Sequence, residues 1–135
     1  MSDVVLVTGG SGFIGTWVLG ELLGRGAEPV VVDTQPAPAR WQRVLGEAAS
    51  RVKQADVSLL DRDGLERAIE RHGVTRVIHL AALLTPACQS DPWLGCQVNV
   101  LGSTALFDAA RHSGRVKSIS YASSYAVYGL SLIHI

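Results

Sequence analysis

Long hydrophobic runs and an excess of charge are both missing from this sequence of 135 residues. No apolar stretch approaches the ~20 residues that a membrane-spanning helix needs, so the sequence predicts no membrane span. The 12 Lys and Arg residues balance the 12 Asp and Glu residues, which leaves a formal net charge of zero. Without a basic surplus, the chain has no electrostatic attraction to nucleic acid or to an anionic membrane. We therefore expect neither nucleic acid nor a membrane as its partner.

Cysteine is scarce as well. Cys88 and Cys96 lie eight positions apart, with neither a C-x-x-C pair nor a histidine at metal-ligand spacing. This arrangement predicts two reduced thiols and no metal site. Residues 1–4 lack the basic region of a signal peptide. Together these features predict a cytoplasmic protein.

The composition that remains is that of a folded domain. Hydrophobic residues make up 47% of the chain and charged residues 18%, which argues against disorder. The length allows one domain with a core of its own. Glycine is enriched: 14 of 135 residues is about 10%, against an average of about 7%.

Short β-branched runs alternate with segments of helical periodicity along the chain. Strands are expected at residues 4–7, 30–33, 52–55, 76–80 and 117–122. Helices are expected at 14–22, at 41–48, from a cap at Ser58 to about residues 72–73, and from the Asp91-Pro92 pair to about 113. Ser58 followed by Asp61 resembles a capping box for the third helix, and residues 83–93 are expected to form a loop. Such alternation predicts an α/β domain with a parallel sheet.

A glycine motif lies between the first strand and the first helix. Its sequence, TGGSGFIG over residues 8–15, has glycines at 9, 12 and 15. Gly9 allows a sharp turn, Gly12 lets the backbone approach a pyrophosphate, and Gly15 lets the helix pack closely on the sheet. The strand–turn–helix context makes this a dinucleotide-binding motif. Phe13 and Ile14, which open the helix, are predicted to contact the cofactor with it.

Acidic residues follow the second and third strands. Asp33 lies 24 positions after Gly9, where a carboxylate accepts hydrogen bonds from ribose hydroxyls and repels a 2′-phosphate. This favours NAD over NADP, although Arg40 in the next loop is a conceivable phosphate partner. Asp56 and Val57 are predicted to meet the adenine.

Taken in order, these motifs resemble those of a known family. The ordered set is TGGSGFIG at 8–15, Asp33, Asp56-Val57, HLAA at 79–82, NVLG at 99–102 and YASSYAVYG at 121–129. The chain resembles the extended short-chain dehydrogenase/reductase family, in its NAD-dependent epimerase/dehydratase branch, from residue 4 to residue 129. The resemblance implies a Rossmann-type, doubly wound parallel sheet of five strands in the order 3-2-1-4-5.

The resemblance also implies roles for residues beyond the glycine motif. Leu80, Ala81 and Ala82 are expected beside the cofactor, NAD, where small side chains admit the dinucleotide. Asn99 is expected behind the nicotinamide as a support or a cofactor contact. His79 is interpreted as a packed histidine at the end of a strand rather than as a catalyst.

Catalysis in this family requires a hydroxyl and a Tyr-x-x-x-Lys pair. Ser124 matches the hydroxyl, which hydrogen-bonds the substrate oxygen during hydride transfer. None of the three tyrosines has a lysine four positions later, and no lysine follows Lys117. The resemblance therefore implies an enzyme acting on a nucleotide-sugar or another hydroxylated substrate, whose full-length form is a homodimer, and predicts that this chain alone is inactive. The alternative is an NAD-sensing module without catalysis.

The end of the chain departs from the family pattern after Gly129. Residues 130–135, LSLIHI, resemble the translation of a sequencing-library adapter, and the alternative is a native apolar tail. We expect residues 1–129 to be an incomplete, truncated NAD-binding domain and 130–135 to be a non-native tail.

Overall fold

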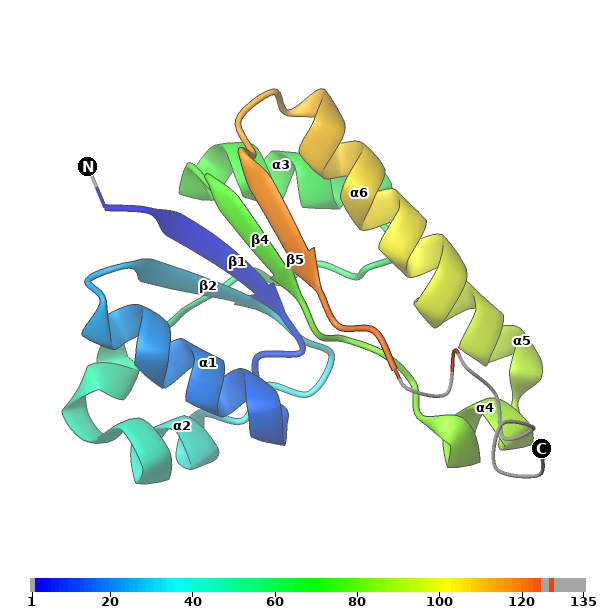
Figure 1. The fold of residues 1–135 in the computed structure, drawn as a ribbon, viewed down its shortest axis with the longest axis horizontal. Coiled ribbons are helices and arrows are strands. Elements are labelled where there is room, and N and C mark those ends of the chain that lie inside the picture. Colours follow the sequence, from blue (N-terminus) through cyan, green and yellow to red (C-terminus); the bar gives the residue numbers. More distant parts are fainter. Residues whose placement is uncertain (1, 125–126, 128–135) are drawn as a thin grey trace.

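Five parallel strands lie at the centre of the chain (Figure 1), whose computed structural model describes residues 2–124 and 127. The strands are β1 (Val4–Thr8), β2 (Glu28–Val32), β3 (Lys53–Gln54), β4 (Arg76–His79) and β5 (Ser118–Tyr121). Their order in the sheet is β3-β2-β1-β4-β5. The predicted Rossmann-type topology is confirmed.

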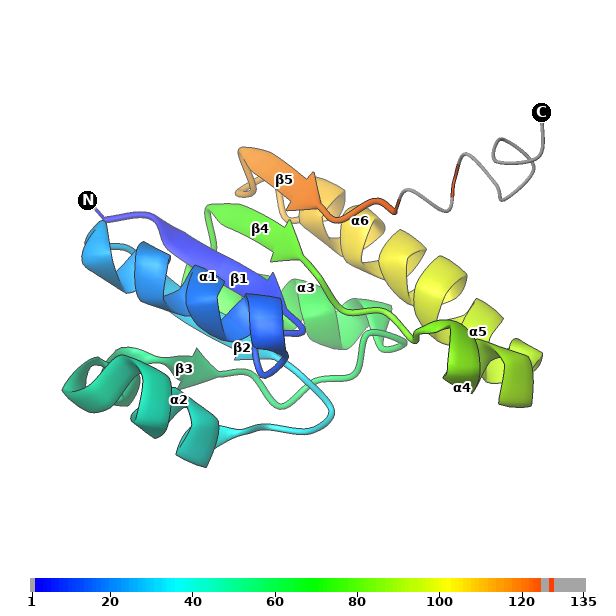
Figure 2. The ribbon, with the colours of Figure 1, turned by 60° about the horizontal axis from the view of Figure 1, so that its bottom comes forward.

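Helices cover the two faces of the sheet (Figures 1 and 2). α1 (Phe13–Gly24) and α2 (Pro38–Leu45), which continues into the 3-10 helix η1 (Gly46–Arg51), lie on one face. α3 (Arg62–His72) and α6 (Ser103–His112) lie on the other. α4 (Thr85–Ser90), α5 (Pro92–Cys96) and the π-helical segment η2 (Gln97–Gly102) complete the order. Within the described residues, no helix is long and apolar enough to cross a membrane.

The alternation of side chains along β1 divides the core into two layers. Leu6 is buried with Leu65 of α3 and Leu106 of α6. Its neighbours Val5 and Val7 face the other layer, with Leu19, Val31 and Trp41. Successive residues of a strand point to opposite faces, so a strand covered by helices on both sides is apolar throughout.

The parallel register brings the ends of four strands to one level. Thr8 pairs with Val32 on one side and with His79 on the other. His79 pairs in turn with Tyr121. The residues that come next along each strand therefore emerge at the same edge of the sheet, where the glycine motif also begins.

The beginnings of two helices differ from the sequence prediction. The N-cap of α3 is Asp61, whose carboxylate accepts a hydrogen bond from the Gly64 amide at 2.9 Å, whereas Ser58 binds the Leu60 amide one turn earlier. The capping-box interpretation of Ser58 is therefore wrong. α2 starts at Pro38 rather than at residue 41, because a proline suits the first turn of a helix.

The segment expected to be a loop at 83–93 contains the short helix α4, whereas the helix expected from the Asp91-Pro92 pair begins there as α5. α4 begins after Leu84 with Pro86 in its first turn, and α5 begins at Pro92, after Asp91 caps the amide of Leu94 at 2.9 Å. Neither helix is long enough to show a 3.6-residue period, which is why pattern analysis missed α4. The long helix that follows α4 contains the π-helical segment η2, which periodicity did not predict.

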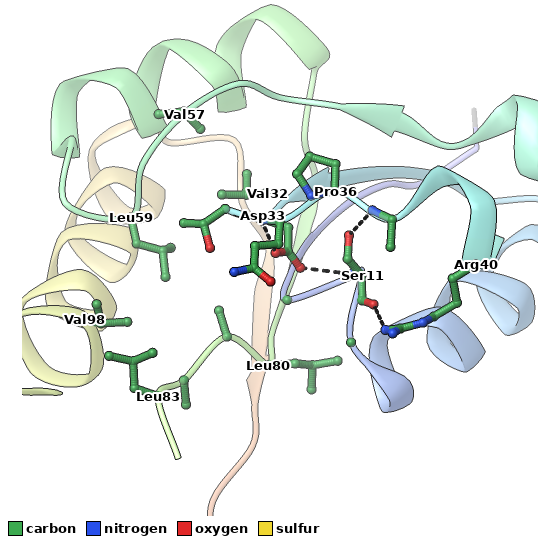
Figure 3. Close-up of a pocket in the computed structure, with 17 residues that line it drawn as sticks. Ser11, Val32, Asp33, Pro36, Arg40, Val57, Leu59, Leu80, Leu83 and Val98 are labelled. Atoms are coloured by element: carbon green, nitrogen blue, oxygen red, sulfur yellow. Dashed lines mark hydrogen bonds between the residues drawn. The ribbon is translucent and has the colours of Figure 1, made fainter. Parts of the chain in front are cut away.

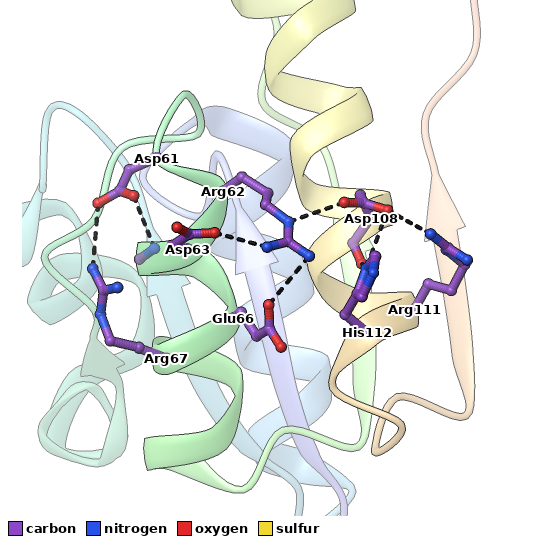
Figure 4. A network of polar contacts seen from close by, with 9 residues as sticks. Asp61, Arg62, Asp63, Glu66, Arg67, Asp108, Arg111 and His112 are labelled. Atoms are coloured by element: carbon purple, nitrogen blue, oxygen red, sulfur yellow. Dashed lines mark hydrogen bonds and ion pairs between the residues drawn. The ribbon is translucent and has the colours of Figure 1, made fainter.

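An ion-pair network joins α3 to α6 (Figure 4). Arg62 Nε lies 2.9 Å from Asp108 Oδ2, and Arg111 lies 3.0 Å from the other oxygen of that carboxylate. Hydrogen bonds from Arg111 and then Arg62 lower the pKa of Asp108. Exposed pairs of this kind contribute little individually, so the buried leucines between the helices carry most of the packing energy.

Candidate functional site

A pocket of about 500 Å³ opens at the carboxyl ends of β1, β2 and β4 (Figure 3). The residues that line it are Gly9, Ser11, Gly12, Val32, Asp33, Thr34, Gln35, Pro36, Ala37, Arg40, Val57, Leu59, Leu80, Ala81, Ala82, Leu83 and Val98. It lies where the strand order reverses around β1, the usual position of a ligand in an open α/β sheet.

The glycine motif forms a turn too tight for side chains. Gly9 has a φ of +71°, and a Cβ there would lie 2.9 Å from the Ala81 amide nitrogen. A Cβ on Gly15 would lie 2.2 Å from the Gly9 carbonyl oxygen. Both positions therefore require glycine for a steric reason that does not depend on a ligand.

The first helical turn of α1 follows the glycine motif and has no side-chain cap. Gly12 is the N-cap residue, and no side chain caps the helix. The amides of Phe13, Ile14 and Gly15 have no intrahelical carbonyl within reach, so the helix start is a positive site for an anion. The side chains of Phe13 and Ile14 are exposed and do not line the pocket.

Asp33 lies in the pocket directly after β2 (Figure 3). Its Oδ2 accepts a hydrogen bond from the Ser11 amide at 3.0 Å, and its Oδ1 accepts one from the Gln35 amide at 2.9 Å. A carboxylate oxygen accepts more than one hydrogen bond, so both atoms retain capacity for a ligand hydroxyl. The carboxylate therefore links the glycine turn to the pocket.

The other predicted contacts divide into two groups. Val57, Leu80, Ala81 and Ala82 line the pocket, whereas Asp56 is exposed and does not. The apolar lining residues that sequence reasoning missed include Leu59, Leu83 and Val98. They come from a turn, a loop and the π-helical segment, which carry no motif.

Asn99 does not line the pocket, but its side chain hydrogen-bonds Leu83, which does. Its Oδ1 accepts a hydrogen bond from the Leu83 amide at 2.8 Å, and its Nδ2 donates to the Leu83 carbonyl at 3.0 Å. The side chain thus pairs with Leu83 as a neighbouring strand would. Asn99 lies in η2, and such π-helical insertions are frequent at functional sites.

His79 is buried behind the same loop. Its Nε2 lies 2.8 Å from Ser103 Oγ, whose proton goes to the Asn99 carbonyl, so Nε2 is the protonated nitrogen that donates to Ser103. Its Nδ1 lies 2.6 Å from Thr8 Oγ1 and therefore accepts the hydroxyl proton of Thr8. Burial lowers the pKa of His79, in keeping with a neutral ring.

The hydroxyl of Thr8 completes this network by holding the pocket loop. Thr8 Oγ1 accepts hydrogen bonds from the amides of Leu80 and Ala81, both at 3.2 Å. In a protonated His79, Nδ1 would carry a hydrogen and point it at Thr8 Oγ1. The lone pairs of that oxygen already accept the amides of Leu80 and Ala81. The neutral histidine is thus a structural element of the loop, as the sequence interpretation held.

Stability should decrease as the pH falls below neutrality. Because the folded pKa of His79 is lowered, the unfolded chain binds more protons, and the stabilisation present above about pH 6.5 is lost as the pH falls toward the folded pKa. We expect the free energy of unfolding in urea to decrease between pH 7.5 and 5.5.

A paired substitution separates the contributions to that pH dependence. His72 also has a pKa lowered by burial and acts in the same direction. In His72→Gln most of the pH dependence should remain, whereas in His79→Gln it should shrink and the free energy of unfolding at pH 7.5 should fall by about 1–2 kcal/mol from lost hydrogen bonds. An unchanged pH profile in His79→Gln would contradict the neutral-histidine network.

Ser124 follows β5 at the same edge of the sheet and is exposed. Its carbonyl accepts a hydrogen bond from the Val127 amide at 3.1 Å. Tyr125, Tyr128 and the expected tail at 130–135 lie outside the described residues. Among the described residues, no group of three His, Cys, Asp or Glu side chains could hold a metal ion.

Comparison with known proteins identifies the relatives of this arrangement. The model of the NAD dependent epimerase/dehydratase family matches residues 5–133. UDP-glucose 4-epimerase of Bos taurus is 33% identical over 96% of this chain and 39% of its own length. D-erythronate dehydrogenase of Cupriavidus necator is 34% identical over 93% of this chain and 40% of its own.

Solved structures agree with these sequence relatives. UDP-glucose 4-epimerase of Bifidobacterium longum, in complex with NAD+ and UDP, superposes with a TM-score of 0.81 and 32% identity over 94% of this chain and 38% of that one. The chain thus spans about two fifths of the length of the proteins it matches. On the family match, the sequence identity and the shared fold, this chain belongs to the NAD-dependent epimerase/dehydratase family.

Proposed function

We propose that this chain binds NAD in the pocket at the carboxyl ends of β1, β2 and β4. The observation that carries the proposal is the joining, in one pocket, of the uncapped start of α1 and the carboxylate of Asp33. An anion belongs at the first and a ribose at the second, and an adenosine diphosphate carries both groups in that order. The complexes of relatives with NAD support the choice of cofactor.

Each part of the cofactor has residues assigned to it in this proposal. The pyrophosphate binds over Gly9, Gly12 and Gly15 at the amides of Phe13 and Ile14. Asp33 accepts hydrogen bonds from the ribose hydroxyls, which excludes a 2′-phosphate by repulsion. Val57 and Asp56 contact the adenine. Leu80, Ala81 and Ala82 form the side of the pocket that lies beside the dinucleotide, and Asn99 supports it through its hydrogen bonds to Leu83.

The chemistry we propose for the full-length enzyme is hydride transfer between NAD and a hydroxyl-bearing carbon. NAD supplies the hydride acceptor when bound. Ser124 hydrogen-bonds the substrate oxygen that loses a proton as the hydride leaves. No lysine follows Lys117 in this sequence, and we propose that the chain alone does not turn over substrate.

The substrate we propose is a nucleotide-sugar. Support comes from relatives named UDP-glucose 4-epimerase, including one from Stenotrophomonas maltophila solved with NAD and formylated UDP-arabinopyranose. The D-erythronate dehydrogenase relative extends the class to other hydroxylated substrates. We further propose a cytoplasmic homodimer as the full-length form.

Titration with NAD tests the proposal directly. Trp41 donates to the Gly10 carbonyl of the glycine turn, so its fluorescence should change as NAD binds. We expect saturable binding of one NAD per chain by fluorescence and by calorimetry, weaker binding of NADP, and no conversion of UDP-glucose. A compact chain that does not bind NAD would contradict the proposal.

A further inference from the structure

The glycine turn is anchored to the first turn of α2 and to Ala37, the residue that precedes this helix. Trp41 Nε1 donates a hydrogen bond to the Gly10 carbonyl at 3.2 Å. The Arg40 guanidinium donates to the Ser11 carbonyl, as Figure 3 shows, and the Ala37 amide donates to Ser11 Oγ at 3.2 Å. Three hydrogen bonds from residues 37–41 thus hold two consecutive residues of the turn.

These contacts occupy the carbonyl ends of two peptide groups whose amide ends are also occupied. The Ser11 amide donates to Asp33 Oδ2 at 3.0 Å, and the Gly12 amide donates to the Gly9 carbonyl at 3.0 Å. Both peptide planes between Gly10 and Gly12 are therefore fixed at each end. After Gly12, the next amides along the chain are those of the opening turn of α1, which are left for a ligand.

The two anchoring side chains have different environments. Trp41 is 5% exposed and packs in the core layer beneath α1, where the ring alone would serve packing. Its indole N–H is an additional, directed contact. Arg40 is exposed and lines the pocket, so its contact with Ser11 contributes little burial. Neither hydrogen bond is explained by core packing.

We propose that Trp41 and Arg40 are positioning residues that hold the Gly10 and Ser11 carbonyl groups on the α2 side of the glycine turn, so that only amides face the cofactor pyrophosphate. The inference rests on the proposed function. A peptide group that rotates can present its carbonyl oxygen where an amide is needed, and a carbonyl dipole repels a phosphate. A turn that is already ordered before binding also lowers the entropic cost of ordering it when the ligand binds.

The role predicts an effect confined to the phosphates of the ligand. Trp41→Phe keeps an aromatic ring in the core but removes the N–H donor, and Arg40→Met removes the donor of the Ser11 contact. We expect each to weaken the binding of ADP and NAD by about tenfold, which is the scale of one lost directed hydrogen bond. Adenosine has no phosphate, and its affinity should change by less than about twofold, because its ribose contact at Asp33 remains.

Matched controls come from the same helices. Trp17→Phe alters an exposed tryptophan of α1, and Arg43→Met alters an exposed arginine of α2, and neither residue lines the pocket. Binding of NAD, ADP and adenosine to the full 135-residue chain is measured by calorimetry and by amide chemical-shift titration. Arg40→Lys keeps the charge and one donor, and should recover part of the lost affinity.

The outcomes separate this inference from the proposed function. Loss of ADP affinity with adenosine affinity retained, in Trp41→Phe or in Arg40→Met, supports it. If the wild-type chain binds NAD but both variants bind ADP as the wild type does, or lose adenosine equally, the inference is overturned and the proposed function stands. If the wild-type chain does not bind NAD, both are overturned. Arg40→Met alters an exposed side chain, so this arm does not depend on a core substitution.

Discussion

Substitution of Gly15 by alanine should abolish NAD binding. An added Cβ would lie 2.2 Å from the Gly9 carbonyl oxygen and 2.7 Å from the Gly10 Cα, both of which are backbone atoms that cannot rotate aside. α1 must then move away from the glycine turn, taking its uncapped amides with it. We expect no NAD binding by calorimetry, and a free energy of unfolding lower by about 3 kcal/mol in urea, as for an overpacked core.

Gly24 provides the control in the same helix. No atom lies within 4 Å of a Cβ added there, and its φ is not positive. Gly24→Ala should retain full NAD affinity and increase the free energy of unfolding by about 0.5 kcal/mol, since alanine favours helix. Wild-type affinity in Gly15→Ala would show that the packing between α1 and the turn is not needed for binding.

The second large effect is expected from Asp33→Ala. Removal of the carboxylate leaves the Ser11 and Gln35 amides without their acceptor and removes the proposed ribose contact. We expect NAD affinity to fall by about 30-fold, which corresponds to about 2 kcal/mol. NADP affinity should fall less or rise, because a negative charge next to a 2′-phosphate is removed.

The ratio of the two affinities is the informative measurement. Asp63, an exposed carboxylate of α3 that does not line the pocket, serves as the control, and Asp63→Ala should leave both affinities unchanged. A preference for NAD over NADP that survives in Asp33→Ala would exclude Asp33 as the residue that selects the cofactor.

Much of the fold was predictable because its signals are local. The apolar run before Gly9, the helical spacing after it and the Asp91-Pro92 pair each report on neighbours within one or two turns. Local signals failed where two residues compete for one role. Ser58 and Asp61 are both suitable N-caps, and only the course of the backbone selected Asp61.

The candidate site was predictable to the same extent. Glycine is required at positions 9 and 15 for steric reasons that a strand–turn–helix motif already implies. The place of Asp33 in the pocket follows from its position after the second strand. The wall formed by Leu59, Leu83 and Val98 was not predictable, because these are ordinary apolar residues without a motif. They line the pocket only because the turn before α3, the segment η2 and the loop after β4 converge.

The alternation of strands and helices and the positions where only glycine fits follow from the order of the residues, since both depend on backbone sterics and short-range periodicity. Which distant atoms meet follows from the folded chain. Trp41 reaches a carbonyl 31 residues earlier, and Thr8 meets His79 across 71 residues. Such contacts depend on the parallel register and on the packing of helices against the sheet, which no linear spacing records.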